Sequence, residues 1–141
     1  MAVLNLVYVP PDDLGSVWEW VRAGLDDARA KAPNREYLYW RNEDVYHELT
    51  HEGAALWKID DVGFLILQKN FTRYETVMFV WVIWAEPYSL LKVHKELMAE
   101  LKKLARAGGV DRIRHISGND WDVLGMFKPV ATIYECGVND D

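Results

Sequence analysis

The longest apolar run of the chain lies between Val77 and Ala85 and is rich in β-branched and aromatic residues. It is too short to span a bilayer, so it predicts a central strand that is buried on both faces. From Ser89 onward, apolar residues recur at three- and four-residue spacing, which predicts a helix that ends at Gly108-Gly109. Arg112 to Ile116 then alternates like a strand. These segments predict a strand–helix–strand unit with parallel strands.

Shorter elements are predicted on both sides of this unit. They are a strand at Val3–Val9, a helix from Asp12 or Asp13 to Pro33, a short helix capped by Asn42 and stopped by Gly53, strands at Ala55–Ile59 and Val62–Lys69 joined at Asp60-Asp61, a short helix within Asn119–Phe127 and a last strand at Val130–Val138. This order predicts an α/β fold with a mixed sheet and helices on both of its faces. We expect a single domain over residues 1–141.

Composition narrows the classes of function. The formal net charge of -6 argues against a dedicated nucleic-acid-binding protein. The lone Cys136 cannot form an intramolecular disulfide, and the start of the chain reads as a strand instead of a signal segment. We therefore expect a cytoplasmic protein that binds neither nucleic acid nor membranes.

Three short motifs stand at defined places relative to the predicted helices and strands. Trp84-Ala85-Glu86 precedes the long helix, Asn119 follows the next strand, and Gly125-Met126-Phe127 precedes the last strand. Through these motifs and the order of its elements, nearly the whole chain resembles the GNAT family of acetyl-CoA-dependent N-acetyltransferases, in a compact version. The resemblance implies transfer of an acetyl group from acetyl-CoA to a small-molecule or protein amine.

The resemblance also implies a cofactor site. The backbone of the central strand would bind the pantetheine arm, and the start of the long helix would hold the pyrophosphate. The residues implied are Ile83, Trp84, Ala85, Ser89, Lys92, His94, Lys95 and Asn119. Unlike the family's glycine-rich pyrophosphate loop, Pro87 to His94 contains no glycine. The alternative is therefore a catalytically inactive GNAT-like module that binds or inhibits a partner.

Glu86 is the candidate general base, because it stands where the central strand ends. A polar residue that merely terminates an apolar strand is the alternative interpretation. The family's usual acid is a tyrosine in the short helix after the penultimate strand, where this chain has Trp121. Tyr88 or Tyr134 is the candidate substitute.

A third hypothesis rests on His47-Glu48-Leu49-Thr50-His51, an H-E-x-x-H sequence typical of zinc hydrolases. Gly53 ends the helix too soon for such a site, and a third ligand would have to come from His94, Glu96 or Glu100. We therefore predict a surface helix and no metal.

Seven tryptophans and seven tyrosines are many for this length. Those predicted to be in the core are Trp18, Trp81 and Trp84. A second group is predicted around the short helix and comprises Tyr37, Tyr39, Trp40, Tyr46 and Trp57. This group can line an acceptor groove or a contact in a homodimer, and the sequence leaves both interpretations open.

Overall fold

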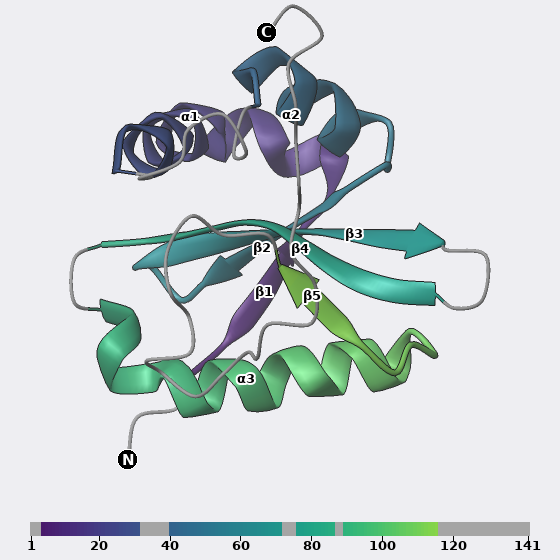
Figure 1. The fold of residues 1–141 in the computed structure, drawn as a ribbon. Helices are drawn as coiled ribbons and strands as arrows, with labels where there is room; N and C mark the ends of the chain where they lie inside the picture. The colour runs from purple at the N-terminus through teal and green to yellow at the C-terminus, as the bar shows by residue number, and fades with distance from the viewer. Residues whose placement is uncertain (1–3, 32–39, 72–75, 87–88, 116–141) are drawn as a thin grey trace, which may run out of the picture.

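The computed structural model describes residues 4–31, 40–71, 76–86 and 89–115. In this part of the chain a five-stranded sheet lies between two helical layers (Figure 1). The elements are β1 (Leu6–Val9), the short 3-10 helix η1 (Pro11–Asp13), α1 (Leu14–Lys31), α2 (Asn42–Thr50), β2 (Ala55–Ile59), β3 (Gly63–Phe71), β4 (Thr76–Ala85), α3 (Ser89–Ala107) and β5 (Ile113–His115). The predicted α/β fold is confirmed. The last predicted helix and strand lie outside the described residues.

The sheet has the order β1-β2-β3-β4-β5. Neighbouring strands from β1 to β4 are antiparallel, whereas β4 and β5 are parallel and are connected through α3. The predicted strand–helix–strand unit is present, and β2, β3 and β4 form an antiparallel meander before it. Asp60, with a φ of 45°, lies in the tight connection between β2 and β3.

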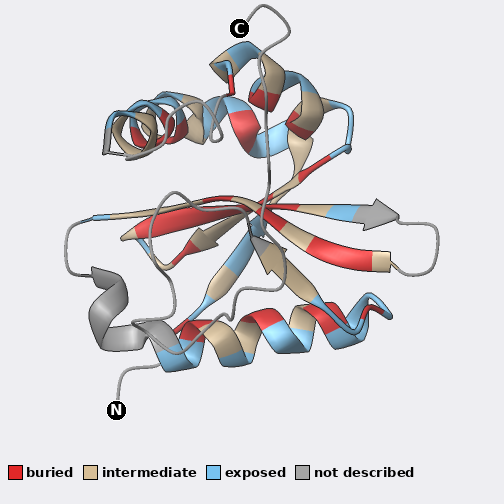
Figure 2. Ribbon diagram, viewed as in Figure 1, coloured by how far each residue is buried: buried red, intermediate tan, exposed pale blue. Residues whose placement is uncertain are grey.

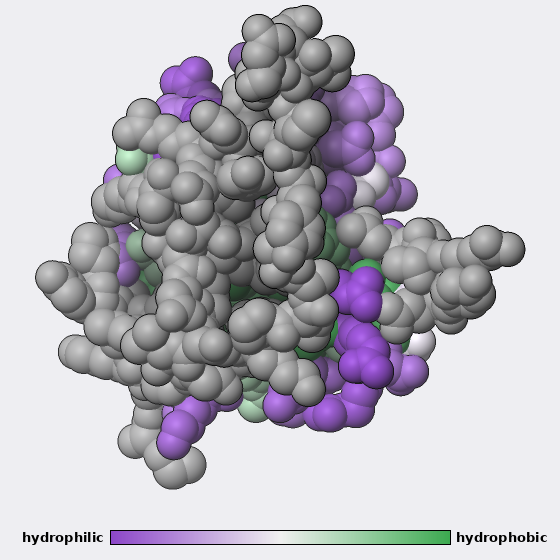
Figure 3. Space-filling model, viewed as in Figure 1, coloured by the Kyte–Doolittle hydropathy of each residue, from purple (hydrophilic) through white to green (hydrophobic). Residues whose placement is uncertain are grey.

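Each face of the sheet has its own apolar core (Figure 2). The first core lies under α1 and α2, and its centre includes Val21, Leu25 and Phe64, which are fully buried. The second lies over α3, where Leu97 and Leu101 are fully buried. Burying one such side chain contributes about 1.5–3 kcal/mol. On the face shown in Figure 3, hydrophilic surface lies over α1–α2 and over α3, with hydrophobic residues between them.

Two predicted details are wrong. Asn42 does not cap α2, because Arg41 occupies the N-cap position; the Asn42 side chain instead donates to Asp26 Oδ1 at 2.9 Å. Trp57 does not lie beside α2. It is partly buried and packs against the core of the α3 face, with its ring centroid 5.3 Å from that of Tyr8.

None of the described helices is both long and apolar enough to cross a membrane.

Candidate functional site

At the carboxyl end of β4, the main-chain N–H and C=O groups of two residues point away from β3. The Glu86 N–H donates to the Val62 carbonyl at 2.8 Å, so the main chain of Glu86 faces β3. Because main-chain groups alternate in direction along a strand, those of Ile83 and Ala85 face the opposite side. That is the side of β5, whose described residues pair only with Met78–Val80. An extended ligand with amide groups can hydrogen-bond to Ile83 and Ala85 there.

A β-bulge at Trp81 decides which groups face this side. Ile66 pairs with Val82 and Leu67 pairs with Val80, which leaves Trp81 as the extra residue of β4. Trp81 and Val82 consequently both pack against the core under α1 and α2, although neighbours in a regular strand face opposite sides. Bulges of this kind redirect a strand and are frequent beside active sites.

Helix α1 covers the same strand end from one face of the sheet. The Trp84 ring lies 5.5 Å from the Phe64 ring and 5.8 Å from the Trp20 ring, measured between centroids. Gly24 lies against these rings, and a Cβ atom there would come within 2.5 Å of Phe64 Cε1. Trp84 Nε1 donates a hydrogen bond of 2.9 Å to Asp27 Oδ2. The end of β4 is therefore fixed to α1.

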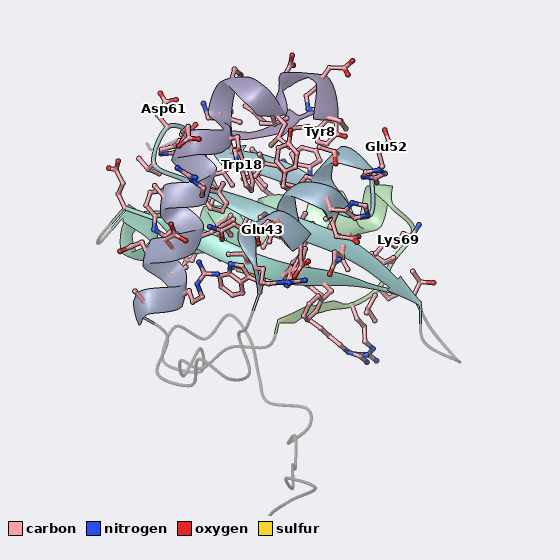
Figure 4. The ribbon with its side chains drawn as sticks, turned by 90° about the horizontal axis from the view of Figure 1, so that it is seen from above. Tyr8, Trp18, Glu43, Glu52, Asp61 and Lys69 are labelled. Carbon is pink, nitrogen blue, oxygen red and sulfur yellow. The ribbon has the colours of Figure 1, made fainter. Side chains whose placement is uncertain are left out.

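Glu86 is exposed and follows β4 directly. Only residues 86–88 separate β4 from α3, so the start of that helix is tied closely to the strand end. The first-turn amides of a helix attract anions, and the first turn of α3 contains no acidic residue. In Figure 4 this end of the sheet is near Asp61, whereas Lys69 marks the opposite end of β3. A carboxylate and a helix N-terminus thus occur at one end of the sheet.

No family model matches the chain, and no curated protein matches it. Solved structures do match. A "probable acetyltransferase" has a TM-score of 0.66 at 13% identity, with 96% of this chain and 99% of that chain covered. A "predicted acetyltransferase" from Clostridium acetobutylicum, in a structure with acetyl-CoA, has a TM-score of 0.62 at 12% identity, with 96% of each chain covered. Aminoglycoside acetyltransferase meta-AAC0020, from an uncultured soil metagenomic sample and in complex with sisomicin, has a TM-score of 0.62 at 12% identity, with 95% and 96% covered.

The fold is GNAT-like. The superpositions extend over nearly the full length of both chains, so they include the sheet and both helical layers. Identities of this size establish the fold alone. The assignment of a reaction depends on this chain's own residues.

Four predicted site residues are described together with their side chains at or near the end of β4. Ile83, Trp84 and Ala85 form its last three positions, and Glu86 follows. Lys95 is described as well and is exposed on α3. Ser89 begins α3. The predictions for the side chains of Ser89, Lys92 and His94, and for Asn119 and Tyr134, lie outside the described residues.

The H-E-x-x-H residues lie on α2, on the outside of the molecule. Helix α2 ends at Thr50, so His51 is its C-cap, and both histidines are exposed. Their rings stack with centroids 4.1 Å apart, and His51 Nδ1 lies 2.9 Å from the His47 carbonyl oxygen. Among the described residues, no three His, Cys, Asp or Glu side chains gather closely enough to hold a metal ion.

We predict that protein purified without chelator or histidine tag contains well under one equivalent of zinc. The reason is that tight zinc sites use three or four protein ligands, whereas α2 supplies two adjacent imidazoles. Elemental analysis by mass spectrometry measures the metal content. Stoichiometric zinc that is lost in His47→Ala would contradict the prediction and favour the hydrolase hypothesis.

Sequence reasoning missed Gly24 and Asp27. The signal for Gly24 was its place inside an amphipathic helix, where glycine costs roughly 1 kcal/mol relative to alanine and so indicates close packing. Asp27 carried no such signal, because its partner Trp84 lies 57 residues away in the sequence.

Proposed function

We propose that this protein is an N-acetyltransferase that moves the acetyl group of acetyl-CoA to an amine. The observation that carries the proposal is the end of β4, where the Ile83 and Ala85 main-chain groups face the β5 side next to Glu86 and the start of α3. The similarity to a solved acetyltransferase structure with acetyl-CoA supports it.

The residues present fit such a ligand. The pantetheine arm of acetyl-CoA carries amide groups, which pair with main-chain N–H and C=O groups as a neighbouring strand would. The amides at the start of α3 would bind the pyrophosphate, with Lys92, His94 and Lys95 adding positive charge along the helix. Asn119 completes the proposed cofactor-binding set. Because Pro87 to His94 contains no glycine, the phosphate would have to be held without the close backbone approach that glycine allows.

The chain's contribution to the reaction is proton transfer and positioning. Acetyl-CoA supplies an activated thioester, and the acceptor nitrogen forms a new bond to the acetyl carbon as the carbon–sulfur bond breaks. Glu86 would take the proton of the attacking amine, directly or through a water molecule. Tyr134 would give a proton to the departing thiolate. A base and an acid in these roles balance the protons of the transfer.

The acceptor is tested by measuring release of the CoA thiol while the protein is incubated with acetyl-CoA and an amine. The panel contains sisomicin, because a structural neighbour was solved with it, together with spermidine and a lysine-containing peptide. We expect at least one amine to raise thiol release well above the rate with acetyl-CoA alone. If the protein binds acetyl-CoA but none of the amines raises release of the CoA thiol, the inactive binding module is favoured.

A further inference from the structure

One stripe of α1 faces the end of β4. Trp20, Gly24 and Asp27 follow at spacings of four and three residues, so they share one face of the helix. All three meet Trp84. Trp20 contacts its ring edge to face, Gly24 leaves room for the ring, and Asp27 accepts the hydrogen bond of its indole nitrogen.

The backbone of α1 packs closely against the Trp84 ring. A Cβ atom on Gly24 would lie 2.9 Å from two carbons of the Trp84 ring. The helix backbone therefore rests directly on the ring, and the ring cannot tilt toward α1. The hydrogen bond to Asp27 then fixes the rotation of the indole in its plane. Charged acceptors form stronger hydrogen bonds than neutral ones, particularly where water is partly excluded.

The held ring is part of the proposed site. Trp84 lies between Ile83 and Ala85, the two residues whose main-chain groups face the β5 side. This segment follows the bulge at Trp81, and its described hydrogen-bonded neighbour is β3 alone. The orientation of the Trp84 side chain therefore bears directly on the direction in which the flanking amides point.

We propose that Asp27 is a positioning residue for acetyl-CoA binding: through the Trp84 indole it holds the end of β4 so that the Ile83 and Ala85 amides meet the ligand. The inference rests on the proposed function. In this role Asp27 would touch neither acetyl-CoA nor the amine and would act through Trp84. If the Ile83 and Ala85 main-chain groups shift by a fraction of an ångström, their hydrogen bonds to the ligand weaken. The loss of one such bond lowers affinity about tenfold.

The experiment measures the dissociation constant of acetyl-CoA by isothermal titration calorimetry, which needs no acceptor. Asp27→Leu should raise it about tenfold, whereas Asp27→Asn, which keeps an oxygen acceptor, should stay within about threefold. Trp84→Phe keeps a ring without the N–H donor and should resemble Asp27→Leu. The double variant Asp27→Leu with Trp84→Phe should bind acetyl-CoA no more weakly than either single variant, because both substitutions remove the same hydrogen bond.

Asp26 provides the matched control. It is the neighbouring residue, but its carboxylate accepts hydrogen bonds from Arg29 and Asn42 and so joins α1 to α2 instead of β4. Asp26→Leu should lower the melting temperature and leave acetyl-CoA affinity unchanged. Equal losses of affinity in Asp26→Leu and Asp27→Leu would overturn the inference, since general loosening of α1 would then explain both.

Two further outcomes separate the inference from the function. Unsubstituted protein that binds acetyl-CoA, with Asp27→Leu binding equally well, would overturn the inference and leave the function standing. Unsubstituted protein that does not bind acetyl-CoA would remove both. Once an acceptor is known, the pH–rate profile of Asp27→Asn should match that of the unsubstituted protein; loss of the acidic limb, where the rate rises with pH as the base loses its proton, would make Asp27 the base instead.

Discussion

Glu86→Gln should lower the rate of acetyl transfer by about 10²–10⁴ at neutral pH while changing stability and acetyl-CoA affinity little. Glutamine keeps the size of the side chain but cannot take a proton from the amine. Because Glu86 is exposed and makes its hydrogen bond to Val62 through the main-chain N–H, the substitution removes no packed side chain. Thiol release with the identified acceptor measures the rate.

The pH dependence sharpens this test. Partial rescue is expected at high pH, where more of the amine is already free and needs no general base. Glu43→Gln is the control, since Glu43 is an exposed carboxylate in the first turn of α2, and it should keep full activity. Full activity of Glu86→Gln across the pH range would mean that another group or the solvent takes the proton. Loss of the folded state would instead make Glu86 a structural residue.

Gly63→Ala should destabilise the fold by about 1–3 kcal/mol and distort the candidate site. Gly63 pairs with Ala85 across β3 and β4, and a Cβ atom there would lie 2.8 Å from the Ala85 Cα and still closer to the Trp84 carbonyl oxygen. Both clashing groups belong to the backbone, so relief requires the end of β4 to move. Thermal unfolding should show the loss, at roughly 4 °C per kcal/mol for a chain of this size.

Gly15→Ala is the matched control for this prediction. Gly15 is exposed near the start of α1, and a Cβ atom there would meet nothing within 4 Å. Alanine should raise stability there by roughly 0.5–1 kcal/mol, because it favours the helical backbone more than glycine does. An unchanged melting temperature for Gly63→Ala, with unchanged acetyl-CoA affinity, would show that the strand end adjusts freely and would weaken the argument from fixed Ile83 and Ala85 amides.

The sequence predicted most of the described fold because its patterns are local. The run from Val77 to Ala85 is apolar on both faces, and the structure places a core on each side of it. Ala55–Ile59 is a strand with the predicted bounds, and α3 begins at the predicted Ser89. The continuous apolar run indicated the central strand, and apolar residues at helical spacing from Ser89 onward indicated α3.

The features that the sequence could not predict depend on strand register and on contacts between distant segments. A continuous apolar run carries no alternation, so the bulge at Trp81 leaves no trace in it. Trp57 was placed beside α2 because it is near in sequence, but strand alternation directs it to the other face. The contact between Trp84 and Asp27 joins distant elements. At the site, the sequence indicated Glu86 and the end of β4, but not the helix that holds them.

Titration of the unsubstituted protein with acetyl-CoA tests the central claim most directly. We expect binding at a one-to-one ratio with a micromolar dissociation constant. At a hundredfold excess over that constant, acetyl-CoA should stabilise the fold by ~2.7 kcal/mol, which corresponds to roughly 10 °C in melting temperature. The absence of both a heat of binding and a shift in melting temperature at millimolar acetyl-CoA would contradict the proposed acetyltransferase. That result would favour a GNAT-like scaffold that serves as a binding module.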